Sequence, residues 1–574
     1  MKIIERTIPA DVAKRLEASG AHPLLAQLYA SRGVVHSDEL DMSLKFLLAP
    51  SGLSGVQAAA QRLAQCIRDD EHLCIVADYD CDGATACAVA YLGLQSLGAK
   101  NVSFIVPDRV NDGYGLTPLI AQRVHALGAK VLMTVDNGMA SFTGVQVAKE
   151  LGLEVIITDH HLPASTTPVA DVIVNPNQRG CNFASKNLAG VGVMFYVLVA
   201  LRAHLRQLGH FEGALSREPK LDTLLPLVAL GTVADVVVLD TNNRRLVEQG
   251  LVRMRQGLMP LGIKALLAVA GKDPSTLCAQ DLGFVLGPRI NAAGRLSDMS
   301  QGIECLITQD AQKAQSLAQT LEDINQSRKG IEVDMKEQAL ELALSMLDDA
   351  DSPPPALCLF DPDFHEGVVG LVASRMKELY HRPTFVFAQS QSLGKEHLLK
   401  GSGRSIAGFH LRDALDVMSK QYPDLIMQFG GHAMAAGCTI EEDQLATFEL
   451  ALQEVAARQL DAHALQMELL CDGSLGPEHC NAAVAELLKS AVWGQGFLTP
   501  VFVNDFTVLS QKIVAQKHLS LLLKLGTVEI SGIWFGRTDA LSRQARLAYR
   551  LDIDEWRGQK KLKIMVQALS PNEA

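Results

Sequence analysis

Short apolar runs alternate with helical patterns through the first third of the chain. The runs are rich in β-branched residues and end in turn residues, which is typical of strands buried on both faces of a sheet. They lie at Leu73–Ala77, Val102–Val106, Val131–Val135, Val155–Ile157 and Val172–Val174. The helical patterns that separate the first three runs lie at Thr85–Leu97 and Leu119–Leu127. Alternation of this kind predicts an α/β fold with a doubly wound, mainly parallel sheet.

The pattern changes twice farther along the chain. Residues 304–348 are charged and mostly helical, and Gly330 is the only Gly or Pro among them, so we expect a long connecting helix. A second α/β region follows, with predicted strands at Leu357–Phe360 and Thr384–Phe387 and a helix at Val368–Leu379 between them. After residue 465, short alternating strands predict a small β-barrel.

These changes divide the 574 residues into five predicted parts, since a chain of this length is too long for one compact core. They are an N-terminal helical segment (1–50), a first α/β domain (51–303), the connecting helix (304–350), a second α/β domain (351–462) and the barrel (463–574).

Composition narrows the class of protein. The longest apolar run, Leu188–Leu201, has 14 residues, which is too short to cross a bilayer as a helix. The N-terminus has no apolar stretch of signal-peptide length. Eleven cysteines are scattered singly with no CxxC motif. We therefore expect a cytoplasmic protein with reduced thiols and no membrane association.

The charge is unevenly distributed. The net charge is −12, yet residues 501–574 carry 11 Lys and Arg against 7 Asp and Glu. A protein that wraps long duplex DNA would have a broader basic surface. A site that admits a single strand past bound cations does not need one.

The strongest candidate for chemistry is the stretch VADYDCDGATA. Asp78, Asp80 and Asp82 directly follow a predicted buried strand, at the edge where open α/β sheets bind ligands. Three carboxylates this close repel one another unless cations compensate. A solvated acidic turn is the alternative for this motif alone. An EF-hand loop is excluded, because Val89 stands where that loop needs Glu and a strand precedes the motif.

Similar side chains follow other predicted strands. VDNG places Asp136 after one strand, TDHH places Asp159, His160 and His161 after the next, and GTVAD places Asp235 after an apolar helix. A single acid after a strand is commonly a helix cap, but several such groups at one sheet edge favour a metal site. Many carboxylates and few histidines favour Mn²⁺ or Mg²⁺ over zinc, in a pair that activates water and neutralises a phosphoryl group.

An ordered series of motifs carries a family resemblance over about residues 50–570. It runs DYDCDG, VDNG, TDHH, GTVAD, GPRINAAGR (287–295), FHEGVVGLVASR (364–375), KGSGRS (400–405) and GGHAMAAG (430–437). The series resembles the DHH phosphoesterases, and with the terminal barrel it is most similar to the RecJ exonucleases among them. The resemblance implies a DHH domain, a DHH-associated domain and an OB-like barrel.

The resemblance also implies roles for individual residues. The implied ligands of two Mn²⁺ or Mg²⁺ ions are Asp80, Asp82, Asp136, His160 and Asp235, with Asp136 as the bridging carboxylate. Asp78 and His161 would lie beside the ions as further catalytic groups. The implied substrate-binding residues are Arg109, Arg289, Asn291, Arg375, Ser402, Arg404 and His432. The glycines of KGSGRS would let backbone N–H groups approach the 5′ phosphate. For any single Arg, a surface salt bridge remains the alternative.

The barrel would bind a single strand of DNA. Its candidate basic contacts are Lys512, Lys517, His518, Lys524 and Arg537, and its candidate stacking partners are Phe502, Phe506, Trp534 and Phe535. A core position is the alternative for each aromatic residue.

The implied activity is 5′-to-3′ hydrolysis of single-stranded DNA to mononucleotides in recombination and repair, with a single-strand-binding protein and a helicase as partners. Two alternatives remain open: a DHH phosphodiesterase for short oligoribonucleotides or cyclic dinucleotides, and a non-catalytic relative. The second would have lost ligands, and none of the five is missing.

Overall fold

The structure is a computed structural model that describes residues 2–109, 112–212, 218–348, 354–392, 394–556 and 559–570. The chain forms two compact units. We call Ile3–Gly294, Asp298–Glu322 and Leu469–Ala574 the sheet–barrel unit, and Met1–Lys2, Arg295–Ser297 and Asp323–Glu468 the central unit.

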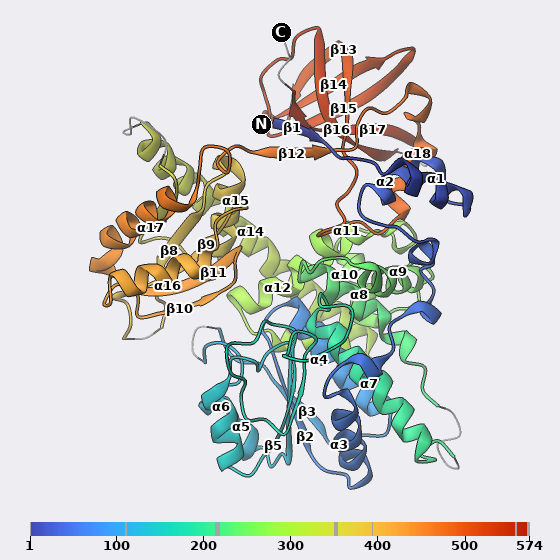
Figure 1. Cartoon of the computed structure of the whole chain (residues 1–574). Helices are drawn as coiled ribbons and strands as arrows, with labels where there is room; N and C mark the ends of the chain where they lie inside the picture. The colour runs from blue at the N-terminus through green and yellow to red at the C-terminus, as the bar shows by residue number, and fades with distance from the viewer. Residues whose placement is uncertain are drawn as a thin grey trace. The chain divides into compact units, whose positions relative to one another are not determined.

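A five-stranded parallel sheet organises the sheet–barrel unit (Figure 1). Its strands are β2 (Leu73–Ala77), β3 (Val102–Ile105), β4 (Val131–Val135), β5 (Glu154–Thr158) and β6 (Val172–Val174), in the order β3-β2-β4-β5-β6. The five predicted strands and their parallel pairing are confirmed. The chain passes to one side of β2 to form β3 and then to the other side to form β4. Such a reversal opens a crevice at the carboxyl ends of the strands, where α/β proteins bind ligands.

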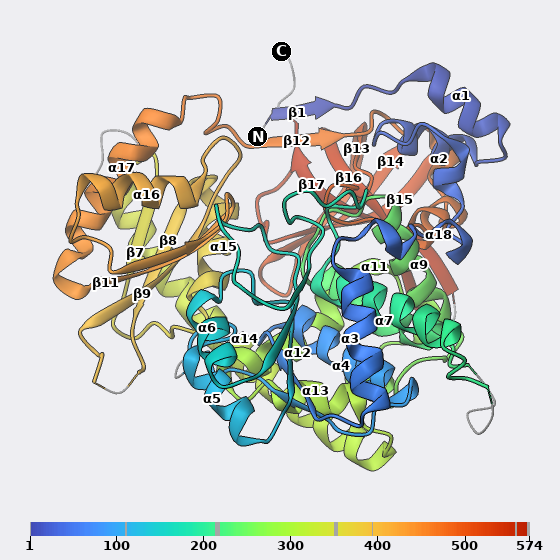
Figure 2. The ribbon, with the colours of Figure 1, turned by 60° about the horizontal axis from the view of Figure 1, so that its bottom comes forward.

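Helices cover both faces of this sheet (Figures 1 and 2). On one face, Ile75 and Met133 belong to the core shared with α3 (Val56–Arg68), α4 (Cys81–Ser96) and α7 (Gly190–Gln207). On the other face, Cys74 and Leu132 pack with α5 (Pro118–Ala126) and α6 (Phe142–Glu150). Both faces are therefore buried, which explains why the strands are continuous apolar runs.

Further elements complete the sheet–barrel unit. Its other helices include α1 (Ala10–Ala18), α2 (Pro23–Ala30), α8 (Leu225–Ala234), α9 (Thr241–Arg255), α10 (Leu261–Val269), α11 (Ala279–Asp281), the π-helix Leu282–Leu286, α12 (Gly287–Leu296), α13 (Ser300–Ile307) and α18 (Ala482–Ser490). Short strands β1 (Lys2–Glu5) and β12 (Glu468–Cys471) pair with each other, a pairing that the sequence pattern did not predict.

The predicted C-terminal barrel is confirmed. Five strands close in the order β13-β14-β15-β17-β16. They are β13 (Phe502–Val514), β14 (His518–Leu525), β15 (Val528–Phe535), β16 (Gln544–Trp556) and β17 (Gln559–Leu569). The apolar core of the barrel is continuous with the core on the α3–α4–α7 face of the sheet, through Trp493 and Phe497.

The central unit contains the long helix α14 (Ala311–Asp348) from Asp323 onward, and a second sheet in the order β10-β11-β9-β8-β7. The strands are β7 (Leu357–Phe360), β8 (Thr384–Gln389), β9 (Leu398–Arg404), β10 (Gln428–Gly431) and β11 (Ala435–Glu441), and the helices around them are α15 (Val369–Tyr380), α16 (Leu411–Gln421) and α17 (Leu445–Gln459). Helices α14 and α15 pack on one face of the sheet, and α16 and α17 pack on the other.

The long helix starts later than the sequence pattern predicted. Helix α13 ends at Ile307, and α14 begins at Ala311. Between them, Asp310 Oδ1 accepts hydrogen bonds from the backbone N–H groups of Gln312 and Lys313, which fixes the start of α14. Helical periodicity continues across this cap, so the pattern alone did not reveal the break.

The prediction that the KGSGRS backbone is open to an anion is wrong. This segment is strand β9, and its residues pair with β8 on one side and β11 on the other. Gly401 and Gly403 instead leave room for the rings of Phe387 and Phe385, since a Cβ at Gly403 would lie 2.5 Å from Phe385 Cζ. The glycines are needed for packing.

No helix among the described residues is long and apolar enough to cross a membrane. The eleven cysteines are all free thiols, as expected.

Candidate metal centre

Carboxylates and histidines meet at the carboxyl edge of the parallel sheet. His160, which follows β5, places its Nε2 atom 3.2 Å from Asp136 Oδ1, after β4. The same nitrogen lies 3.4 Å from Asp235 Oδ2 and 4.0 Å from Asp82 Oδ2. Three segments that are distant in sequence therefore place carboxylates around the imidazole of a fourth, as the motif series led us to expect.

The described residues form three overlapping groups of potential metal ligands. Within each group, the ligand atoms lie within 4.8 Å of one another. The groups are Asp136, His160 and His161; Asp82, His160 and Asp235; and Asp78, Asp80 and Asp136. Asp136 and His160 each belong to two groups. This overlap suits neighbouring ions that share a carboxylate.

The backbone conformation and the buried carboxylate of Asp136 fit a metal ligand. Its backbone φ of 62° lies in the left-handed region, which few residues other than Gly adopt. Its Oδ1 atom is buried and accepts no hydrogen bond from the described residues. The next residue secures the turn, because Asn137 Nδ2 donates to the carbonyl oxygens of Val76 (3.0 Å) and Val135 (2.9 Å). Carboxylate oxygens and imidazole nitrogens of this kind fit Mn²⁺ or Mg²⁺.

The start of helix α7 holds Asp82. The backbone N–H groups of Gly190 and Val191 donate to its two carboxylate oxygens at 2.6 and 2.9 Å. The positive end of a helix dipole stabilises a carboxylate in this position. A Cβ at Gly190 would lie 2.5 Å from Asp136 Oδ1, so only glycine fits between the two carboxylates.

Burial and mutual repulsion work against ionisation of this cluster. Burial, and next the charge of Asp80, raise the pKa of Asp78 and of Asp82 to about 7. Burial, and next the charge of Asp82, raise the pKa of Asp136 and of Asp235 well above the usual carboxyl range. Divalent cations would remove both penalties.

Asp159 is a site residue that sequence reasoning did not assign. Its Oδ1 accepts from His161 Nδ1 at 2.7 Å, and its Oδ2 accepts from the Met139 amide at 2.9 Å. Burial alone would raise the pKa of Asp159, but the His161 hydrogen bond and charge outweigh it and bring the pKa to about 2. Burial would lower the pKa of His161, and Asp159 outweighs it and raises the pKa to about 9. The acid next to the histidines in TDHH was the available signal.

Two tyrosines connect Arg109 to the centre. The Arg109 guanidinium lies over the Tyr79 ring, 4.3 Å from its centroid. Tyr79 and Tyr114 contact edge to face at 5.8 Å, and Tyr114 and His161 do so at 6.3 Å. Arg109 is therefore held near the metal centre, and the tyrosines were not among the predicted site residues.

Two other predicted substrate-binding residues are engaged by protein groups. Asn291 Oδ1 accepts from the Cys81 amide at 2.7 Å and so braces the DYDCDG loop. Arg289 is largely buried; its Nε lies 2.5 Å from Glu322 Oε2, and its Nη1 donates to the Val285 carbonyl.

In the central unit, Ser402 and Arg404 lie on the same face of β9, and Arg404 Nη1 donates to Ser402 Oγ at 3.0 Å. The first turn of α15 is close to both, because a Cβ at Gly370 would lie 2.9 Å from Arg404 Nη2 and 3.0 Å from Ser402 Oγ. Arg375 forms ion pairs with Glu332 and Glu378. His432 is exposed between β10 and β11.

The predicted aromatic contacts of the barrel differ in burial. Phe502 and Phe506 are buried in the core. Phe535 is 54% exposed and contacts His518 edge to face at 4.9 Å, and Arg537 lies 4.8 Å from the Trp534 ring centroid. The second group remains a candidate strand contact.

Comparisons with known proteins agree with this arrangement. Residues 72–232 match the DHH family, N-terminal domain; residues 354–458 match the DHHA1 domain; and residues 471–568 match the RecJ OB domain.

Full-length relatives extend the match over nearly the whole chain. The chain is 46% identical over 557 residues to the single-stranded-DNA-specific exonuclease RecJ of Escherichia coli (strain K12), covering 96% of both. It is 45% identical over 560 residues to RecJ of Haemophilus influenzae, again covering 96% of both. The crystal structure of RecJ in complex with Mn²⁺ from Thermus thermophilus is similar, with a TM-score of 0.81 and 29% identity over all of this chain and 80% of that one. The chain therefore belongs to the RecJ family, with its DHH, DHHA1 and RecJ OB domains.

Proposed function

We propose that this protein is a metal-dependent exonuclease specific for single-stranded DNA, which degrades a strand from its 5′ end and releases mononucleotides in recombination and repair. The observation that carries the proposal is the pair of shared ligands, Asp136 and His160, at the switch point of the sheet. The family relatives named as single-stranded-DNA-specific exonucleases support it.

The site residues would have different roles in metal binding and in contact with the substrate. Asp80, Asp82, Asp136, His160 and Asp235 would hold two Mn²⁺ or Mg²⁺ ions. When bound, such ions supply activation of water and neutralisation of charge on the phosphoryl group. Asp82 is fixed by hydrogen bonds from the start of α7. Asp159 accepts a hydrogen bond from Nδ1 of His161 and so orients the imidazole, whose Nε2 would donate a proton or a hydrogen bond to a phosphate oxygen.

Phosphate recognition would rest on cationic side chains. Ser402 and Arg404 form one pair beside the first turn of α15, where backbone N–H groups also favour an anion. We assign them to the 5′ phosphate. Arg109, stacked on Tyr79 beside the metal centre, would bind the strand there.

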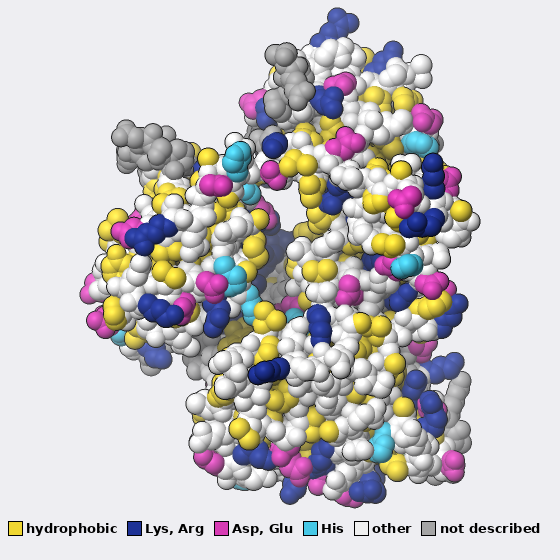
Figure 3. All heavy atoms as spheres, viewed as in Figure 1, with side chains coloured by type: hydrophobic (Ala, Val, Ile, Leu, Met, Phe, Trp, Pro, Cys, Tyr) yellow, Lys and Arg dark blue, Asp and Glu magenta, His cyan; other side chains and the backbone are white. Residues whose placement is uncertain are grey.

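The rest of the strand would run along the barrel. Phe535, Trp534, His518 and Arg537 combine stacking surfaces with a positive charge, as single-strand binding requires. Basic and acidic side chains are interspersed on the face drawn in Figure 3, outside its grey residues. That mixture fits contact with one strand better than wrapping of a duplex.

We also propose, from the family resemblance, that a single-strand-binding protein and a helicase deliver the substrate. A cytoplasmic location, where DNA is repaired in bacteria, goes with this proposal.

A labelled-substrate assay tests the function. The full chain is incubated with Mn²⁺ and end-labelled single strands, duplexes and dinucleotides. We expect mononucleotides only from single strands with an accessible 5′ end, and no product from Asp136→Asn, which keeps a residue type that tolerates the left-handed backbone. Hydrolysis of dinucleotides alone, or metal binding without hydrolysis, would refute the proposal.

A second variant tests the phosphate assignment. Arg404→Gln should slow degradation of 5′-phosphorylated strands at least about tenfold, the loss expected for a charge-assisted contact. Arg412→Gln, at an exposed position of α16 in the same unit, is the matched control and should have no effect. Equal rates for the two variants would remove Arg404 from the phosphate site.

A further inference from the structure

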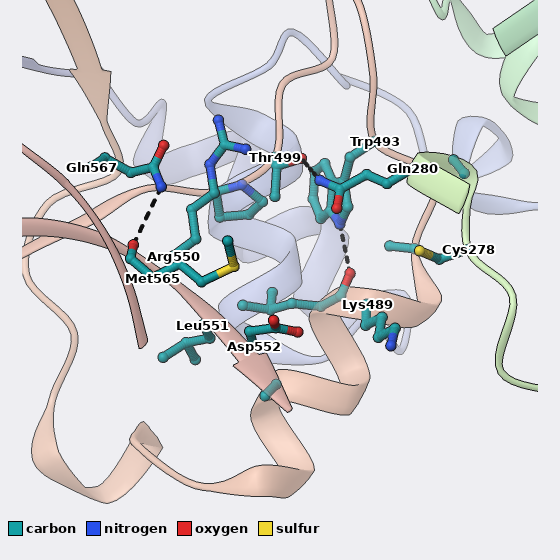
Figure 4. Close-up of a pocket in the computed structure, with 15 residues that line it drawn as sticks. Cys278, Gln280, Lys489, Trp493, Thr499, Arg550, Leu551, Asp552, Met565 and Gln567 are labelled. Atoms are coloured by element: carbon teal, nitrogen blue, oxygen red, sulfur yellow. Dashed lines mark hydrogen bonds between the residues drawn. The ribbon is translucent and has the colours of Figure 1, made fainter. Parts of the chain in front are cut away.

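A cavity of about 140 Å³ lies within the sheet–barrel unit, apart from the metal centre (Figure 4). Its walls come from α11 and the residue before it, from α18, from the segment 491–500 and from barrel strands β16 and β17. None of its lining residues belongs to the ligand groups around Asp136. The proposed function leaves this cavity without a role.

Arg550 is the unusual residue of the cavity. Its side chain forms no ion pair and no hydrogen bond with the described residues, and its Nε atom is buried. Burial lowers the pKa of Arg550. By contrast Arg546, four residues earlier on the same strand, is paired with Asp505 at 3.3 Å. A guanidinium stays charged in proteins, so a half-buried one without a partner favours an anionic ligand.

Apolar side chains line another part of the cavity wall. Leu488, Trp493 and Met565 present apolar surface. Trp493 is fixed, because its Nε1 donates to the Leu488 carbonyl at 2.6 Å and its ring stacks on Phe497 at 5.3 Å. A fixed apolar wall beside a cation suits a ligand with a flat, weakly polar body.

Polar groups at the cavity offer hydrogen-bond acceptors. Gln280 Nε2 donates to Thr499 Oγ1 and Gln567 Nε2 donates to the Met565 carbonyl, which leaves both amide oxygens as acceptors toward the cavity or solvent. Asp552 adds a carboxylate. A peptide with an apolar C-terminal residue would match the cation and the apolar wall, but it would leave these groups unused. A nucleobase edge carries N–H donors that match them.

We propose that this cavity is a nucleotide-binding site, with the phosphate on Arg550 and the base against the apolar wall near Trp493 and Met565. The choice of a nucleotide rests in part on the proposed function, because hydrolysis of DNA supplies this ligand at every cycle. The nucleotide has two possible sources, a released mononucleotide or one unit of the bound strand. Since α11 and the barrel both line the cavity, an occupant would tie the barrel to the sheet domain.

Titration calorimetry on the full chain tests the proposal, with dAMP or a 5′-phosphorylated dT hexamer in excess EDTA. Without divalent ions the metal centre cannot hold the phosphate through a metal, so binding is measured separately from nuclease activity. We expect saturable binding of at least one probe. Arg550→Gln should weaken it at least about tenfold, and Arg550→Lys less. Arg546→Gln, on the same strand but outside the cavity, should bind as the wild type does.

The outcomes separate the two sources. Binding of dAMP that depends on Arg550 identifies the released product, and Arg550-dependent binding of the hexamer alone identifies the strand. Binding that is unchanged in Arg550→Gln, no saturable binding of either probe, or Arg550-dependent binding only of a peptide with an apolar C-terminus would overturn the nucleotide assignment. Thermal melts of each variant show whether it is folded. If Arg550→Gln unfolds, Arg550→Lys and a Gln567→Ala variant carry the test.

Discussion

Asp82 and Asp136 illustrate how closely single residues are fitted at the metal centre. Two carboxylates approach each other across a backbone that has no room for a side chain at Gly190. The glycine has no side chain that could bind a metal ion, yet it sets the separation of two proposed ligands. Such a residue is easily overlooked when only titratable side chains are considered.

Gly190→Ala should therefore impair the centre without unfolding the protein. The added Cβ must displace Asp136 or the start of α7, and a shift of this size can cost about 10²-fold in rate. Nuclease rate and Mn²⁺ affinity are the measurements. Gly192→Ala is the control two residues later, because its Cβ would meet only the flexible side chain of Leu188 at 3.2 Å. Equal rates for the two variants would contradict this account.

Asp159→Asn should weaken the site through His161. The variant loses the charge that fixes the imidazole, and loss of such an orienting group typically costs about 10–100-fold in metal affinity or activity. Asp171→Asn is a matched control, since Asp171 also accepts a backbone N–H but its ion-pair partner is Lys149 on the surface. We expect the control to keep full activity. An active Asp159→Asn variant would show that His161 needs no such orientation.

The residue types in the sequence predicted that the acidic groups lie close together, but not which neighbouring residues hold them in place. Asp136 and His160 could be placed at one edge because parallel strands end on the same side of a sheet. The roles of Tyr79 and Gly190 depend on contacts between segments that the sequence does not reveal. Neutral or small residues carry no chemical signal of their own.

At the scale of elements, β9 shows how a glycine-rich motif can serve packing. Gly401 and Gly403 face the rings of Phe387 and Phe385 on the neighbouring strand. Their backbones are paired on both sides, so only the side chains of Ser402 and Arg404 are left to contact a ligand. Glycine-rich loops that bind phosphate and glycine-rich strands that admit aromatic rings look alike in sequence.

Gly403→Ala should destabilise the central unit by about 1–3 kcal/mol, the range for overpacking a core. Gly437→Ala on the adjacent strand β11 should change stability by less than about 1 kcal/mol, because the nearest atom to its Cβ would be 3.4 Å away. Thermal or urea unfolding measures both. If Phe385→Leu restores the stability of Gly403→Ala, the ring is the cause. No rescue, or equal stability of the two glycine variants, would argue against it.

Elements with strong periodicity were predicted well. The strands of the parallel sheet are buried on both faces, so their apolar runs are unbroken and their ends are clear. Strand β1 escaped prediction because it is a partly exposed edge that depends on β12, which is more than 400 residues away. Pairing at such separation has no local signal.

At the scale of the whole molecule, the metal centre should control stability. Three buried carboxylates and the partly buried Asp235 repel one another without cations, so Mn²⁺ bound only by the folded protein should raise the Tm. A concentration 100 times the Kd corresponds to about 2.7 kcal/mol. Asp136→Asn removes one repelling charge and should raise the Tm of the metal-free protein while reducing the effect of Mn²⁺. A Tm that is insensitive to Mn²⁺ in the wild type would contradict the centre.

The hydrogen bonds of Asn137, which secure the turn at Asp136, have a consequence for the chemical ageing of the protein. Asn137 precedes Gly138, and Asn-Gly is the dipeptide most prone to deamidation, because the glycine nitrogen readily attacks the asparagine amide. In the folded chain both hydrogen bonds of Asn137 hold its amide against carbonyl oxygens of β2 and β4, away from that attack. Prolonged storage of unfolded material should therefore convert this asparagine to aspartate or isoaspartate. Refolded protein would then carry an extra negative charge beside a ligand, a lesion that mass spectrometry can detect.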